Sequence, residues 1–245
     1  MKSLPKDTVI DSVIYGNVLQ TSRDAAYLAR HVGHRAGLDI KVPTITVNRL
    51  CGSGFTTVIQ AAQEIMLGEA SVVLAGGSEN MSQAPFALRD SRKGSRYGVD
   101  VVLEDTLSHG LIDSFPEKTP MGITAENLAK KYKITRKDAD EYASKSQKRW
   151  DSANKSGIFK NEIVNVALES KKGVEMFEVD EHPRPQTTAE SLGKLKPVFI
   201  RDTGVVTAGN ASGICDGAAS IIVAGEAAVK LYGLKPLARI GEFAV

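Results

Sequence analysis

The chain has 245 residues, of which 42% are apolar and 24% are charged, and its formal net charge is +2. This near balance of charge gives no reason to expect nucleic acid or a membrane surface as a partner, although a small anionic ligand needs only a local basic patch. No apolar run reaches the roughly 18 residues that cross a bilayer, and the first residues resemble neither a secretory signal nor a transit peptide. The composition predicts an ordinary globular chain with one large domain or two modest ones.

Strand and helix patterns alternate in the first third of the chain. Runs of β-branched and apolar residues predict strands, and apolar positions at helical spacing predict helices that end near glycines. This alternation predicts an α/β fold in which helices cover an open parallel sheet. The predicted elements, in chain order, are a strand over 9–19, a helix over 23–36, a strand over 44–47, a helix over 55–67 and a strand over 71–75.

The composition changes near Arg89 and changes back after Pro197. Between them the chain is rich in charged and turn residues, and it contains one long helical pattern over 125–156 with a face suited to solvent. The apolar character then returns with a predicted strand over 218–224 and a predicted helix over 226–232. We therefore expect one α/β domain formed by residues 1–89 and 197–245, interrupted by an inserted α-rich segment over 90–196.

The cysteines are too few for a disulfide framework, which favours a reducing compartment. Cys215, in the loop before the last predicted strand, is interpreted as structural. The histidines predict no metal site, because His31 and His34 share a helix face without a third ligand nearby in the sequence. His109 and His182 lie in turn-rich sequence and are expected to be exposed rather than catalytic. No glycine-rich loop of the known nucleotide-binding spacings occurs.

Cys51 lies in the stretch NRLCGSGF, between a predicted strand and a predicted helix. Such a turn is where open α/β sheets place functional groups. Gly52 and Gly54 allow unusual backbone angles and the close approach of another group. The free N–H groups at the start of the helix favour the thiolate, which is the nucleophilic form, and could also hold a developing oxyanion. The local pattern supports an acyl-transfer nucleophile and a buried, inert cysteine about equally.

Five segments occur in this order along the chain: NRLCGSGF, AGGSENMSQAP, MGITAENLA, DEHPRPQTTAESLGKLKPVF and VTAGNASGICDGAA. They resemble motifs of the thiolase family, and the resemblance is closest to its mitochondrial 3-ketoacyl-CoA branch, the acetyl-CoA acyltransferases. The resemblance covers nearly the whole chain. It implies an open mixed sheet flanked by helices, and an acyltransferase of fatty acid β-oxidation located in the mitochondrion.

The resemblance also implies a role for individual residues. Cys51 matches the family's nucleophile, which takes the acyl group from a 3-ketoacyl-CoA and passes it to free CoA, and its own backbone N–H matches one oxyanion donor. The segment over 90–196 resembles the loop domain that binds coenzyme A, which is a substrate rather than a permanently bound cofactor. Positions that match the CoA channel are Met121, Arg184, Ser191 and Phe199, and positions that match contacts to the pantetheine arm are Ala208 and Ser212. For Met121 and Phe199, simple packing is an equally good interpretation.

The chain departs from the family pattern in ways that bear on activity. The family's second domain, which supplies the N-E-A-F asparagine, the activating histidine and the C-x-G-G-G cysteine, has no counterpart in this sequence, and neither does the family's first strand and helix. Without its usual base, Cys51 is expected to be weakly active or inactive in this chain alone. The missing strand is expected to leave a gap inside the sheet and apolar surface exposed.

Other functions stay open at this stage. The chain could be a non-catalytic CoA-binding or subunit-assembly module, acting in a homo-oligomer (a dimer or tetramer) or in association with full-length thiolase. A condensing enzyme of the ketoacyl synthase type also uses a cysteine at a strand-to-helix turn, but the PRPQTT and TAGNASG segments argue against it. The sequence could also be incomplete, as a fragment, an isoform or a gene-prediction product.

Overall fold

The computed structural model describes residues 4–244, and the chain divides into two compact units. The first unit contains the chain up to His109 and again from Ile214 onward, and the second unit is Gly110–Gly213. These bounds differ from the expected insertion over 90–196. The strand β4 (Phe86–Leu88) pairs with β5 (Leu103–Asp105), which keeps residues 89–102 with the first unit. At the other end, residues 197–213 are hydrogen-bonded into the second unit, as described below.

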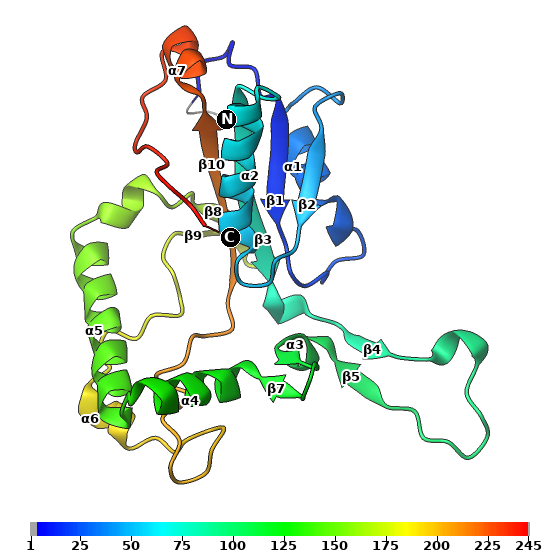
Figure 1. Cartoon of the computed structure of the whole chain (residues 1–245), viewed down its shortest axis with the longest axis vertical. Helices are drawn as coiled ribbons and strands as arrows, with labels where there is room; N and C mark the ends of the chain where they lie inside the picture. Colours follow the sequence, from blue (N-terminus) through cyan, green and yellow to red (C-terminus); the bar gives the residue numbers. More distant parts are fainter. Residues whose placement is uncertain (1–3, 245) are drawn as a thin grey trace. The chain divides into compact units, whose positions relative to one another are not determined.

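The first unit is built on a four-stranded sheet with the order β10-β3-β1-β2. β1 is parallel to both β2 and β3, whereas β10 is antiparallel to β3, so the expected open mixed sheet is confirmed. Figure 1 shows these strands side by side. The elements of this unit are β1 (Ser12–Gly16), a 3-10 turn (Ala25–Tyr27), α1 (Leu28–Arg35), β2 (Thr44–Val47), α2 (Ser53–Leu67), β3 (Val72–Asn80), a 3-10 turn (Met81–Gln83), β4, a 3-10 turn (Ser91–Lys93), β5, α3 (Thr106–Gly110), which ends at the unit boundary, β10 (Asp216–Ala224) and α7 (Glu226–Tyr232).

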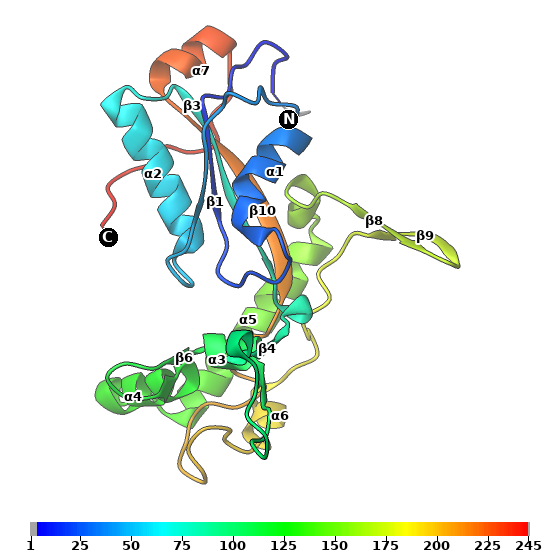
Figure 2. The same cartoon turned by 90° about the vertical axis from the view of Figure 1, so that its right-hand side faces the viewer.

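The core of this unit lies on both faces of β1. All five residues of β1 are buried, and because successive side chains point to opposite faces, they divide between two apolar clusters. Val13 and Tyr15 pack with Ala29 of α1, whereas Ile14 packs with Ala61 of α2. Figure 2 shows α1 and α2 on opposite faces of the sheet. Each buried Val or Ile stabilises the fold by about 1.5–3 kcal/mol relative to an exposed one.

The central position of β1 corrects one expectation. β1 pairs directly with β2 on one side and with β3 on the other, so the described sheet has no gap where a missing strand had been expected. The predicted strand over 9–19 is shorter in the structure, and the strand predicted over 71–75 extends to Asn80. The extension follows from β10, which pairs with β3 along nine residues and supplies backbone partners beyond the apolar run.

The second unit is mainly helical. Its elements are β6 (Ile112–Asp113), β7 (Thr119–Pro120), α4 (Met121–Tyr132), α5 (Arg136–Lys155), a 3-10 turn (Ile158–Asn161), the hairpin β8 (Val166–Ser170) and β9 (Gly173–Phe177), and α6 (Ala189–Gly193). The single helix predicted over 125–156 is wrong, because two helices form there. Lys133 takes a left-handed conformation that ends α4, and the Thr135 hydroxyl and Asp138 carboxylate form a capping box that starts α5. No helix in residues 4–244 is long and apolar enough to cross a membrane.

Candidate functional site

Cys51 lies between β2 and α2, two residues before the first residue of α2, and it is exposed. The turn that carries it is held by Ser53, which is buried. The Ser53 hydroxyl accepts the Arg49 N–H at 2.8 Å and donates to the Leu50 carbonyl at 2.7 Å. The N–H of Gly52 also returns to the Arg49 carbonyl at 3.1 Å. The alternative of a buried cysteine is therefore wrong, because a tight turn presents the thiol to solvent.

The start of α2, two residues after Cys51, has free backbone donors. The Thr56 N–H is bonded to the carbonyl of Gly52, but within residues 4–244 the N–H groups of Gly54 and Phe55 have no acceptor. A Cβ built on Gly54 would meet nothing within 4 Å, so this side of the turn is open. The positive end of the helix dipole and these free donors favour negative charge near Cys51. The turn can therefore support a thiolate or an oxyanion.

Gly16, the last residue of β1, sets how closely the turn approaches the sheet. A Cβ on Gly16 would lie 2.9 Å from the Cβ of Ser53, a distance that real side chains essentially never show. Glycine at this position lets the first residue of α2 sit directly on the end of β1. Because Ser53 also holds the Cys51 turn, the packing at Gly16 places the thiol at the carboxyl end of the parallel strands.

The six residues matched to coenzyme A contacts all lie in the second unit and are all exposed: Met121, Arg184, Ser191, Phe199, Ala208 and Ser212. They come from α4, α6 and the irregular segments around them. Three glycines bring these segments together, because each lies against a side chain from a distant part of the same unit.

Gly122 brings together the first turn of α4 and the segment that carries Phe199. A Cβ on Gly122 would fall 2.0 Å from the ring of Phe199, so the ring lies directly on the first turn of α4. Met121 is the neighbouring residue and starts that helix. The structure therefore places Met121 and Phe199, the two large apolar candidates, on adjoining segments.

Gly209 brings a second pair of segments together. A Cβ there would lie 2.5 Å from Leu192 Cδ2 and 2.6 Å from Leu195 Cδ1, so the turn carrying Ala208 packs against the end of α6. Leu192 is buried and follows Ser191 directly. Ala208 and Ser191 are thus carried by segments in direct contact.

Gly213 brings together a third pair of segments, those that carry His182 and Ser212. A Cβ on Gly213 would lie 2.0 Å from the imidazole Cε1 of His182, so that ring covers the backbone next to Ser212. His182 is exposed, as expected, and it precedes the loop that carries Arg184. The segments that carry Arg184 and Ser212 therefore adjoin.

Buried polar side chains fix the 205–212 segment in this unit. Glu126 of α4 is buried, and its carboxylate accepts the N–H groups of Val205 at 2.9 Å and Val206 at 2.9 Å. Asn210 donates through Nδ2 to the buried Asp140 carboxylate at 2.9 Å and to the Val205 carbonyl at 2.8 Å. Arg136 completes this cluster with a 2.8 Å ion pair to Asp140. Such fully bonded buried networks hold one conformation, because any alternative leaves a buried polar group without a partner.

Two of the polar candidates already make contacts within their own loops. Nη1 of Arg184 donates to the carbonyls of Glu181 at 2.6 Å and His182 at 3.1 Å, which orients the guanidinium. The Ser191 hydroxyl donates to the Thr188 carbonyl at 2.8 Å and accepts the Thr188 N–H at 3.1 Å, in a capping box at the start of α6. Arg184 therefore keeps free donors for an anion, whereas Ser191 can offer a ligand only its remaining acceptor capacity.

Comparison with known proteins decides the family. The profile of the N-terminal domain of thiolase matches residues 3–227. The chain belongs to the thiolase family. It is 54% identical to a mitochondrial 3-ketoacyl-CoA thiolase of Mus musculus over 237 residues, covering 97% of this chain and 59% of that protein. It is also 44% identical over 234 residues to the β-ketothiolase BktB of Cupriavidus necator, covering 96% of this chain and 59% of that protein.

Solved structures agree with this assignment. The crystal structure of human mitochondrial 3-ketoacyl-CoA thiolase matches with a TM-score of 0.90 and 53% identity, over 94% of this chain and 58% of that one. The same human protein in complex with CoA matches with a TM-score of 0.88 at 53% identity, over 94% of this chain and 57% of that one. This thiolase chain thus spans about 59% of the length of the curated relatives it matches.

Several residues that shape the thiolase site were not identified from the sequence. Glu126 lies three residues before the buried Ala129, so a charged residue on the apolar side of a helix was the available signal. Asp140 and Asn210 gave no such signal, because their partners are remote in sequence. Cys215 had been interpreted as structural, but it is exposed, in the segment before β10.

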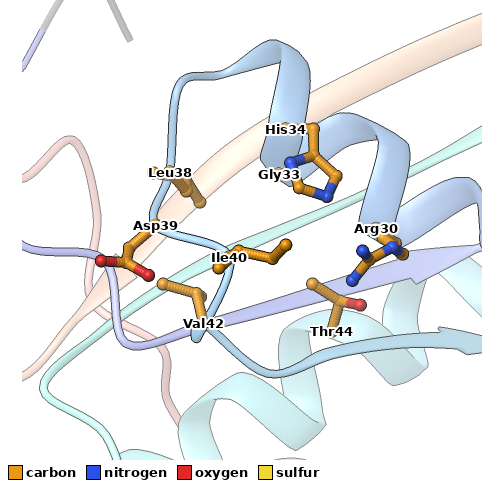
Figure 3. A pocket seen from close by; sticks show the side chains of 8 residues that line it. All are labelled: Arg30, Gly33, His34, Leu38, Asp39, Ile40, Val42 and Thr44. Carbon is orange, nitrogen blue, oxygen red and sulfur yellow. The ribbon is translucent and has the colours of Figure 1, made fainter.

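The cavity in Figure 3 contributes nothing to this site. It lies between α1 and the start of β2 in the first unit, and its volume is about 10 Å³, which is room for about one water molecule. Its side chains are those of Arg30, Gly33, His34, Leu38, Asp39, Ile40, Val42 and Thr44. Among residues 4–244, no group of three or more His, Cys, Asp or Glu residues is placed to hold a metal ion.

Proposed function

We propose that this thiolase chain supplies the acyl-accepting cysteine and the CoA-binding segments of a 3-ketoacyl-CoA acyltransferase. The observation that carries the proposal is the exposed Cys51 thiol at the helix end, in a turn that also offers free N–H donors. Relatives across most of this chain are named for that activity.

In the proposed reaction the Cys51 thiolate attacks the C3 carbonyl of a 3-ketoacyl-CoA. The carbonyl oxygen takes the negative charge, and backbone N–H groups stabilise it. When the carbonyl re-forms, the C2–C3 bond breaks, and its electron pair stays on C2 of acetyl-CoA, which takes up a proton. The shortened acyl group is left as a thioester on Cys51. The thiolate of free CoA then attacks this thioester, which releases acyl-CoA and returns the Cys51 thiolate.

The proton transfers require a base and an acid close to the thiol. The hydrogen bonds of the turn are made by Asn48, Arg49, Leu50, Gly52 and Ser53, and none involves the Cys51 thiol in the described chain. A nucleophile without its base keeps only a small part of its rate. We therefore propose slow acylation of Cys51 by this chain alone, with little turnover.

Mass spectrometry tests the nucleophile. The full chain is incubated with acetyl-CoA, and one acetyl group is expected on Cys51 but none on Cys215, which is also exposed and serves as the internal control. Cys51→Ser should abolish the labile adduct, and Cys215→Ser should not. Equal labelling of the two cysteines, or none at Cys51, would refute the proposal.

We also propose that the second unit binds CoA through Met121, Arg184, Ser191, Phe199, Ala208 and Ser212, whose segments adjoin in pairs. A solved relative with CoA bound supports this proposal.

Arg184 is the candidate for the phosphates, because guanidinium N–H groups match phosphate oxygens. Arg184→Ala is expected to weaken CoA binding by about tenfold in calorimetric titration. Arg149 is an exposed arginine of α5, and Arg149→Ala is the control for lost charge. An equal loss of CoA affinity in both variants would contradict the assignment.

Assembly and location are proposed from the relatives. We propose that the chain forms a dimer or tetramer, or associates with a full-length thiolase; size-exclusion chromatography coupled to light scattering, alone and mixed with a full-length thiolase, distinguishes these states. A monomer in both samples would count against assembly.

We propose a mitochondrial location because several relatives are named mitochondrial. Fractionation of the native cells tests the location.

A further inference from the structure

The end of β3 and the two segments that follow β1 and β2 are tied together at the carboxyl end of these parallel strands. Glu79, near the end of β3, accepts the N–H groups of Val18 at 3.0 Å and Leu19 at 3.0 Å with its two carboxylate oxygens. Asn48, directly after β2, donates through Nδ2 to the Val18 carbonyl at 3.1 Å. These bonds connect β3 to the segment after β1, and that segment to the one after β2.

The last bond in this series reaches the residue before the nucleophile. Oδ1 of Asn48 accepts the N–H of Leu50 at 2.9 Å. Leu50 has a φ of 49°, a left-handed conformation that a residue with a Cβ rarely adopts. This conformation is strained and persists only where surrounding contacts impose it. Asn48 is therefore placed to hold the strained residue that turns the chain into Cys51.

We propose that Asn48 and Glu79 are positioning residues for Cys51. Glu79 fixes Val18 and Leu19, Val18 anchors Asn48, and Asn48 holds Leu50, so that the turn keeps Cys51 in place before the start of α2. The inference rests on the proposed function only in taking Cys51 as the nucleophile. The bonds themselves are independent of any substrate.

Glu79 is suited to the start of this series. Its side chain is partly buried between the segments it joins, and a carboxylate forms stronger hydrogen bonds to N–H groups than a neutral acceptor does. Glu79→Gln keeps one acceptor oxygen but turns an amide NH₂ toward a backbone N–H. Asn48→Ala removes both the bond to Val18 and the bond to Leu50.

Competitive alkylation measures the position of the thiol without using CoA. The full chain is treated with limiting iodoacetamide, and the labelling rates of Cys51 and Cys215 are read by peptide mass spectrometry. In Asn48→Ala the Cys51 rate is expected to fall about threefold, because the turn that Asn48 holds through Leu50 no longer keeps the exposed thiol in one position before α2. Cys215 directly precedes β10, at the opposite edge of the sheet from β2, and its rate is expected to stay constant in Asn48→Ala.

Asp11 provides a matched control for Glu79. Its carboxylate also accepts two successive backbone N–H groups, those of Ser71 at 2.8 Å and Val72 at 3.0 Å, but at the opposite end of β3. Asp11→Asn should therefore lower the unfolding temperature as Glu79→Gln does, yet leave the Cys51 rate unchanged. If Asp11→Asn slows Cys51 as much as Glu79→Gln, the effect is general destabilisation and the proposal is overturned.

Leu50→Gly separates positioning from a merely structural role. Glycine adopts a positive φ without strain, so it needs less holding by Asn48. The effect of Asn48→Ala on the Cys51 rate is expected to shrink in the Leu50→Gly background, and a full effect there would contradict the proposal. An unchanged or raised Cys51 rate in both Asn48→Ala and Glu79→Gln would also overturn it.

Parallel labelling with acetyl-CoA keeps the two proposals apart. If wild-type Cys51 is not acetylated while the alkylation differences hold, the acyl-transfer function fails and the positioning role stands. If acetylation of Cys51 occurs in wild type and the alkylation rates do not respond to Asn48→Ala or Glu79→Gln, the positioning role fails and the function stands.

Discussion

Glu126 and Val206 are 80 residues apart in the sequence, and in the structure the Val206 N–H donates to the buried Glu126 carboxylate at 2.9 Å. The same carboxylate accepts the N–H of Val205. One side chain of α4 therefore holds the start of the segment that carries Ala208 and Ser212. The position of the proposed pantetheine contacts depends on this bond.

Replacement of Glu126 is expected to release that segment. Glu126→Ala leaves two backbone N–H groups without an acceptor, so the second unit should lose about 2–3 kcal/mol of unfolding free energy. Hydrogen exchange at Val205 and Val206 should accelerate together. Asp138→Ala, which removes the capping box of α5, is the control: it should lower the stability of the second unit but leave exchange at these two residues unchanged. Unchanged exchange in Glu126→Ala would show that other contacts hold the segment.

Gly122 should not tolerate a methyl group. Gly122→Ala would place a Cβ 2.0 Å from the Phe199 ring, so it should destabilise the second unit by about 1–3 kcal/mol. Phe199→Leu in the same chain should recover part of this loss in a double-mutant cycle of chemical denaturation. Gly193→Ala, where a Cβ meets nothing within 4 Å, should be neutral or slightly stabilising. Additive losses in the cycle would mean that the ring is not the obstacle.

Lys133 offers a stabilising substitution. It follows the last turn of α4 with a φ of 55°, in the left-handed position where helices usually place glycine. Lys133→Gly should raise the stability of the second unit by about 1 kcal/mol. Lys130→Gly, within the last turn of the same helix, should lower it by a similar amount. A shift in the same direction for both variants, measured by thermal unfolding, would contradict this interpretation.

Tyr15 should make the first unit sensitive to alkaline pH. Burial raises the pKa of Tyr15 above its usual 10.0, and the hydrogen bond with Ser220 partly lowers it. Because the folded pKa is raised, the neutral phenol's contribution to stability is complete below pH 10 and is lost as the pH rises through the folded pKa. Ser220→Ala should raise the Tyr15 pKa further, as measured by absorbance titration against Tyr15→Phe. A lowered pKa in Ser220→Ala would contradict the assignment.

Local patterns in the sequence predicted much of the first unit. Strand and helix periodicities located β1, α1, β2, α2, β10 and α7, because such periodicities report the burial of neighbouring positions on one face. The glycine turn at Cys51 also followed from local information, since the strand, the turn and the helix start are contiguous. The thiolase motifs then gave the family, which the comparisons confirm.

The sequence by itself thus determined most elements of the first unit, the family and the glycine turn that carries Cys51, whereas the exposure of that thiol came from the structure. Only the tertiary structure decided the antiparallel direction of β10, the direct pairing of β1 with β3, and the partners of Glu79, Glu126 and Asp140. The physical reason is distance along the chain. A buried carboxylate must find donors, but any of many backbone N–H groups could satisfy it, and only the packing of remote segments selects those of Val18, Val205 or Val206.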